Sequence, residues 1–218
     1  LEYLLAATFM SAPAGLLIAK IIIPLPKEVR EQLIEEGKDT KIESAEEDKP
    51  ANVIDAAATG ASTGLKMAIE VAGALLAFVA IIALINGILG SVGGMLGFDL
   101  TLEGIFGVIL APIAFLIGVP WEEAFIAGQF IGQKIAINEF VAFANLGEVI
   151  DTLSDKATII LSFALAGFAN LGSIAIQIGS ISTLAPNRRA EVSKLGFRAM
   201  LGGCLVSLLN AAIAGMFI

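Results

Sequence analysis

The longest uncharged stretch of the sequence is the feature that most limits what the chain can fold into. No Asp, Glu, Lys or Arg lies between Ala157 and Asn187, and about 20 apolar residues are enough to cross the hydrocarbon core of a bilayer. Other apolar runs reach that length at Leu4 to Pro24, Val71 to Phe98 and Ala199 to Ile218. Only 16% of the residues are charged and 57% are hydrophobic, whereas about a quarter of the residues of a soluble domain are charged. The sequence therefore predicts an all-α, polytopic membrane protein.

The residue types present exclude several classes of function. The chain has no His and a single Cys, Cys204, so it can form no internal disulfide, no ordinary zinc site and no Ser-His or Cys-His nucleophile pair. The net charge is −8, but the acidic residues cluster in one loop, so the charge does not indicate a substrate. We expect a protein that is not an enzyme, needs no cofactor and does not bind nucleic acid.

Breaks between the apolar runs divide the chain into segments. We expect a transmembrane helix over 1–24, a charged cytoplasmic loop and an amphipathic interfacial segment over 25–66, a long helix over 67–98, an interfacial helix on the outer side over 99–120, a re-entrant hairpin over 121–151, a discontinuous transmembrane helix over 152–187 and the last transmembrane helix over 188–218. Leu1 is not an initiator Met and no signal peptide is evident. We therefore interpret the chain as a piece of a longer protein.

Basic residues predict the orientation of these segments. Lysines and arginines gather in residues 27–49 and again in residues 187–198, and cytoplasmic loops are enriched in both types. If both loops are cytoplasmic, residues 121–151 cannot cross fully, because a crossing there would put the two loops on opposite sides. Each apolar half of this segment is also too short to span, so it should enter and leave on the outer side.

One ionisable residue falls inside the predicted hairpin. Glu139 lies in IAINEFVAF, and a charged side chain at the bilayer centre costs on the order of 2.5 kcal/mol or more. It is therefore expected to face a cavity or a partner. Two interpretations stay open at this point: a substrate-binding carboxylate, or a carboxylate that snorkels or pairs with Lys134 for structural reasons alone.

The middle of the longest apolar stretch, GFANLGSIAIQ, is unexpectedly polar. Gly167 and Gly172 each disfavour helix by about 1 kcal/mol relative to Ala, which predicts a break near FANLGS. Transporters often bind polar solutes at such breaks. Close packing of small residues is the alternative, but it explains Asn170, Ser173 and Gln177 less well than the glycines. Together with a carboxylate and an aromatic ring, these groups suit a neutral, hydroxyl-rich substrate.

Several longer motifs resemble the concentrative nucleoside transporter family. They are GVPWEEA, GQKIAINEFVAF, SFALAGFANLGSIAIQIGSISTLAPNRRAEVSKLGFRAML and, near the start, ATFMSAPAGLLIAKIIIP. The resemblance covers essentially the whole chain and is weakest in residues 27–49. In that family a hairpin glutamate and an Asn and a Ser of the broken helix hold the ribose, and an aromatic residue lies beside the base. The resemblance implies that Glu139, Asn170, Ser173 and Phe168 bind the substrate here.

The resemblance also implies the architecture, the transport mechanism and the oligomeric state of the whole protein. The chain would be the C-terminal half of a bacterial-type, inverted-repeat symporter of the inner membrane that takes up nucleosides by alternating access and forms a homotrimer. Residues 1–24 would lie in the moving transport domain and residues 67–98 in the scaffold at the trimer axis. The coupling cation, Na+ or H+, would bind outside this chain, in the N-terminal half. A transporter of another neutral polar solute, a channel and a non-transporting scaffold subunit remain the alternatives.

Overall fold

The fold is entirely helical in the part of the chain that the structure describes. The structure is a computed structural model, and it describes residues 2–28, 31, 51–184 and 186–218. The helices are α1 (Glu2–Ile22), α3 (Val53–Leu96), α4 (Leu102–Leu116), α5 (Trp121–Ala136), α6 (Glu139–Val149), α7 (Asp155–Leu165), α8 (Leu171–Leu184) and α9 (Arg189–Gly215), with short 3-10 turns at Ile150–Thr152 and Pro186–Arg188. The all-α class is confirmed. Most of the predicted charged loop lies outside the described residues.

The described residues contain three helical stretches that are long and apolar enough to cross a membrane. They are α1, α9 and residues Val79–Leu96 of α3. The pair α4 and α5 is a fourth candidate, although the chain turns by 118° between the two helices. Large apolar side chains such as Phe9, Leu76 and Met95 are exposed on α1 and α3, as on helices that face lipid tails. The polytopic membrane class is therefore confirmed as well.

The long helix α3 differs from the prediction at its start. It begins at Val53 rather than at Met67, so residues 53–66 are its first turns and not a separate interfacial segment. The side chain of Asn52 accepts a hydrogen bond from the backbone N–H of Asp55 (2.9 Å), which is the arrangement of a helix N-cap. The alanine-rich sequence that follows favours helix, and Gly60 and Gly64 do not interrupt it.

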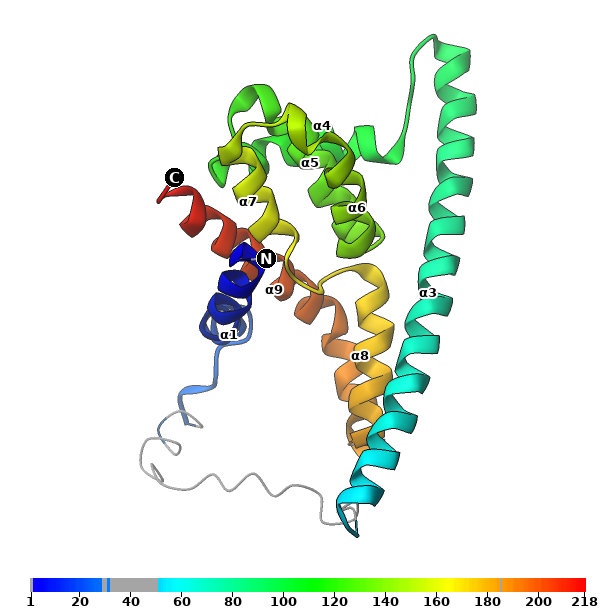
Figure 1. Cartoon of the computed structure of the whole chain (residues 1–218), viewed down its shortest axis with the longest axis vertical. Helices are drawn as coiled ribbons and strands as arrows, with labels where there is room; N and C mark the ends of the chain where they lie inside the picture. Colours follow the sequence, from blue (N-terminus) through cyan, green and yellow to red (C-terminus); the bar gives the residue numbers. More distant parts are fainter. Residues whose placement is uncertain (1, 29–30, 32–50, 185) are drawn as a thin grey trace.

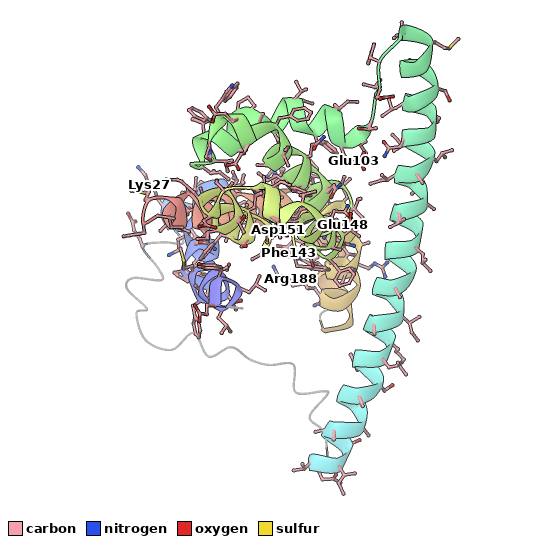
Figure 2. All side chains as sticks on the ribbon, turned by 45° about the horizontal axis from the view of Figure 1, so that its top comes forward. Lys27, Glu103, Phe143, Glu148, Asp151 and Arg188 are labelled. Carbon is pink, nitrogen blue, oxygen red and sulfur yellow. The ribbon has the colours of Figure 1, made fainter. Side chains whose placement is uncertain are left out.

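Figure 1 shows α3 as one long helix along the side of the molecule, with α8 beside its first half and α4 near its end. Asn86 ties α3 to α4, because its Nδ2 donates to Glu103 Oε2 (2.9 Å) and its Oδ1 accepts from the backbone N–H of Leu102 (2.8 Å). Glu103 lies at the end of α4 that is nearest α3 (Figure 2). The remaining helices gather on one side of α3.

Helices α1, α4, α5, α6, α7 and α9 all contribute residues to the larger core. Helix α9 packs against α1, α7 and α8, and α5 packs against α4, α6 and α7. The core residues Ile131, Ile160, Leu161 and Leu165 come from α5 and α7 and are fully or almost fully buried. The hairpin α5/α6 is thus fixed against the first half of the broken helix.

Candidate substrate site

The site is built around the break between α7 and α8. Helix α7 ends at Leu165 and α8 begins at Leu171, so residues 166–170 are not helical. This is the break that the glycines and Asn170 predicted. Where a helix stops, its last carbonyls and the first N–H groups of the next helix lose their helical partners. The break therefore places polar backbone in the interior of an apolar protein.

At the start of α8, the side chains of Asn170 and Ser173 each accept a hydrogen bond from the backbone N–H of the other residue. The backbone N–H of Ser173 donates to Asn170 Oδ1 (2.8 Å), and the backbone N–H of Asn170 donates to Ser173 Oγ (3.1 Å). The Ser173 hydroxyl in turn donates to the Asn170 carbonyl (2.7 Å). Only 2% of Asn170 and 1% of Ser173 is exposed. Both side chains are thus held in fixed positions at the N-terminus of α8.

Glu139 reaches this network from the hairpin. It is the first residue of α6, whose N-cap is Asn138, with Oδ1 accepting from the backbone N–H of Val141 (2.9 Å). Glu139 Oε2 accepts a hydrogen bond from Asn170 Nδ2 at 3.2 Å. The structure therefore brings together three of the four residues that the sequence pointed to, and the carboxylate and the amide face each other.

Lys134 does not form the ion pair with Glu139 that one interpretation of the sequence offered. Within the part of the chain that the structure describes, Lys134 and Glu139 form no ion pair, and the ion pair found there joins Arg188 to Glu191. Lys134 Nζ donates instead to the carbonyl of Ala164 at 2.8 Å. Glu139 is hydrogen-bonded to Asn170 at the break and not to Lys134.

The fourth predicted residue, Phe168, lies in the break but outside the hydrogen-bonded network. Its side chain is 46% exposed. It precedes Asn170 by two positions in the sequence, and its ring is not packed into the core. Gln177 is exposed on α8, beyond Ser173.

Two polar contacts near the site were not foreseen from the sequence. Asn145 Nδ2 donates to Gln133 Oε1 (3.1 Å) and joins α5 to α6, and Asn210 Nδ2 donates to Ser11 Oγ (3.0 Å) and joins α1 to α9. Each pair lies within apolar segments, where a polar side chain needs a partner. The presence of these polar residues within apolar segments could have predicted that each has a hydrogen-bond partner on another helix.

The polar side chains of the site are a carboxylate, an amide and a hydroxyl group. Across residues 2–28, 31, 51–184 and 186–218, no three His, Cys, Asp or Glu side chains come together to hold an ion. Its carboxylate, amide and hydroxyl groups are instead hydrogen-bonding groups that suit a substrate with several hydroxyls.

Comparison with known proteins decides the family. The sequence model described as "Na+ dependent nucleoside transporter C-terminus" matches residues 3–215. The chain belongs to this Na+-dependent nucleoside transporter family. The expectation from the motifs is confirmed, and the relatives in the family are transporters and permeases rather than enzymes.

The relatives include proteins from bacteria and animals. The nucleoside permease NupC of Helicobacter pylori is 47% identical over all of this chain and 51% of its own length. The uncharacterized transporter YutK of Bacillus subtilis is 55% identical over all of this chain and 53% of its own length. Human sodium/nucleoside cotransporter 1 is 34% identical over 98% of this chain and 34% of its own length. The chain thus spans about half the length of its bacterial relatives.

Solved structures of the nucleoside transporter family have the same fold. The structure of CNTnw in an inward-facing substrate-bound state matches with a TM-score of 0.81 and 50% identity over 99% of this chain and 50% of that one. A variant of CNTnw in its intermediate 2 state matches with a TM-score of 0.86 and 51% identity over 100% of this chain and 52% of that one. The bent and broken helices described above therefore belong to a transporter fold.

Proposed function

We propose that the intact protein takes up nucleosides across the membrane and that the chain described here supplies the part of the site that holds the ribose. The hydrogen bond between Glu139 and Asn170 carries the proposal, because it joins a carboxylate and an amide at the break between α7 and α8. A carboxylate offers about four acceptor positions. One bond to Asn170 leaves capacity for the hydroxyl groups of a sugar.

Each of the four residues has a distinct part in this proposal. Glu139 and Asn170 bind ribose hydroxyls, and Ser173 holds Asn170 in place and lines the same wall. Phe168 offers its exposed ring to the nucleobase, since an aromatic face stacks on a planar ring. A neutral nucleoside fits this set, because an anionic substrate would meet the carboxylate of Glu139.

Uptake would be driven by a cation gradient, of Na+ or of H+, through alternating access. The printed name of the family and of its human relative supports sodium. In this proposal the cation binds in the N-terminal half of a longer protein, α3 belongs to the scaffold of a homotrimer in the cytoplasmic membrane, and the helices around the break move as a unit. The exposed apolar side chains of α3 support its contact with lipid or neighbouring subunits.

Radiolabelled uridine uptake by the full-length protein in proteoliposomes tests the proposal. We expect Glu139→Gln and Asn170→Ala each to lower kcat/KM at least about tenfold, since a lost hydrogen bond to a charged group is worth about 1.5 to 3 kcal/mol. Glu148→Gln is the matched control, because Glu148 lies on the same helix α6 and is exposed. Replacing Na+ with choline, and varying pH at constant Na+, identifies the coupling ion.

The outcomes separate the site from the function. If both site variants transport like the wild type while uptake is saturable, the residues are wrong and the function stands. If the wild type moves no uridine, the proposed function is wrong. Uptake that does not saturate would indicate a channel.

A further inference from the structure

Lys134 is the largest side chain that the protein buries completely within the described residues, and the proposed binding site does not use it. Only 2% of it is exposed, and it lies in the last turn of α5 at the tip of the hairpin. A buried ammonium group is costly unless it is hydrogen-bonded and electrostatically compensated. The position of Lys134 therefore needs a physical reason.

The reason lies at the end of α7. Lys134 Nζ donates to the carbonyl of Ala164 at 2.8 Å, and Ala164 is the penultimate residue of α7. In an unbroken helix this carbonyl would accept from the N–H group four residues later, which the break removes. The C-terminal end of a helix also carries a partial negative charge that favours a cation. Lys134 thus supplies both a donor and a charge to the end of α7.

Gly167 lets the break lie close to α9 beside this contact. A Cβ atom added to Gly167 would collide with Ser207 Oγ of α9 and would lie 3.5 Å from Lys134 Nζ. The backbone of the break therefore passes close to α9, with the ammonium group on the same side of Gly167. Glycine allows that close approach because it has no side chain.

Glu139 has the opposite relation to the other half of the broken helix. It accepts from the side chain of Asn170, the residue that immediately precedes α8, and the N-terminal end of a helix favours an anion. The hairpin therefore presents a cation to the end of α7 and an anion to the start of α8. Each of the two charges at the hairpin tip is therefore opposite in sign to the helix end that it faces.

We propose that Lys134 is a positioning residue that holds the break open at the width at which Asn170 and Ser173 meet Glu139. It touches no substrate in this arrangement and acts through the backbone of residues 164–167. The proposal rests on the proposed nucleoside site. Its consequence is that nucleoside affinity depends on a side chain that lies behind the site.

The test measures uridine binding and local hydrogen exchange in the purified full-length protein. In Lys134→Met, which keeps the length of the side chain but has no donor and no charge, we expect uridine to bind about tenfold more weakly. Amide exchange of peptides covering residues 164–173 should accelerate, while peptides of α4 stay unchanged. Lys134→Gln, which keeps an N–H donor without the charge, should fall between Lys134→Met and the wild type, and it serves if Lys134→Met does not fold.

Lys156→Met is the matched control. Lys156 Nζ also donates to a backbone carbonyl, that of Ile218 (3.0 Å), but at the exposed start of α7. We expect uridine affinity and exchange in residues 164–173 to stay as in the wild type. A general loss of lysine contacts would affect both variants, whereas the positioning role affects Lys134 alone.

Two results keep this proposal separate from the proposed function. If Glu139→Gln abolishes uridine binding while a folded Lys134 variant binds within twofold of the wild type, Lys134 has no positioning role and the nucleoside site stands. If Glu139→Gln binds uridine normally, the nucleoside site itself is wrong. Slower exchange or unchanged exchange in residues 164–173 of Lys134→Met would also overturn the positioning role.

Discussion

At the scale of single residues, the start of α8 depends on one hydroxyl group. Ser173 Oγ accepts from the N–H of Asn170 and donates to its carbonyl, and both residues are buried. Ser173→Ala keeps the bond from the residue 173 N–H to Asn170 Oδ1 but removes the reciprocal side-chain bond, which leaves the buried N–H of Asn170 without a partner. We expect it to lower the free energy of unfolding by about 2 kcal/mol, measured as a drop in the thermal midpoint of the detergent-solubilised full-length protein.

Ser91→Ala is the control for that residue. The Ser91 hydroxyl donates to the Gly87 carbonyl of its own helix α3 (2.8 Å) and is exposed. Such a bond back to the preceding turn adds little to stability, so the midpoint should not move measurably. Equal midpoints for the two variants would show that the cap of α8 is not a stabilising element.

At the scale of elements, the contact between α4 and α5 depends on glycine. A Cβ atom on Gly128 would lie 2.8 Å from the Gly107 carbonyl oxygen and 2.9 Å from the Ala111 nitrogen, both backbone atoms of α4. Because backbone cannot turn aside as a side chain can, Gly128→Ala must push the helices apart. We expect a loss of about 1 to 3 kcal/mol, measured by thermal unfolding.

Gly147→Ala provides the comparison within the same hairpin. No atom lies within 4 Å of the position that its Cβ would occupy, and glycine inside a helix is roughly 0.5 to 1 kcal/mol less stable than alanine. Gly147→Ala should therefore raise the midpoint slightly. A higher midpoint for Gly128→Ala as well would mean that α4 does not pack closely on α5.

The elements also show how far the sequence could predict the fold. Residue types predicted the break between α7 and α8, because glycines disfavour helix. They also predicted that Glu139 faces a partner, and the half-buried carboxylate does accept a hydrogen bond from Asn170. The sequence also contains a GxxxG motif, formed by Gly128 and Gly132, which is typical of close helix contacts and could have predicted the packing of α5 on α4. The start of α3 at Val53 was missed, because small residues in an amphipathic stretch looked like a separate segment.

Other contacts leave no trace in residue types. The partner of Lys134 is a backbone carbonyl, and every residue has one. Ala164 becomes special only because α7 ends directly after it. The nearest ionisable residue of opposite sign, Glu139, was therefore the natural partner to consider from the sequence, and it was the wrong one.

At the scale of the whole molecule, the helix ends divide between two sides. In Figure 1 the start of α3 and the junction of α8 with α9 lie at the lower end, whereas the junction of α3 with α4 and the C-terminus lie higher. Two basic residues, Arg188 and Arg189, lie at this junction of α8 with α9. Positively charged segments remain in the cytoplasm, so the lower side should be cytoplasmic.

Cysteine labelling tests this orientation in cells that express a cysteine-free full-length protein. Cysteines introduced at Lys27 or Asn187 should react with a membrane-impermeant maleimide only after permeabilisation, because both positions are exposed and the basic residues around them predict a cytoplasmic location. Cysteines at Asp99 or Asp151, which are exposed just after the C-terminal ends of α3 and α6, should react in intact cells.

Labelling of Asn187→Cys and Asp151→Cys from the same side would mean that α7 and α8 do not together cross the membrane. The break could not then lie at the depth that shields its polar groups from lipid. Labelling on opposite sides would place the carboxylate of Glu139 and the amide of Asn170 between two aqueous compartments, where a transported nucleoside must pass.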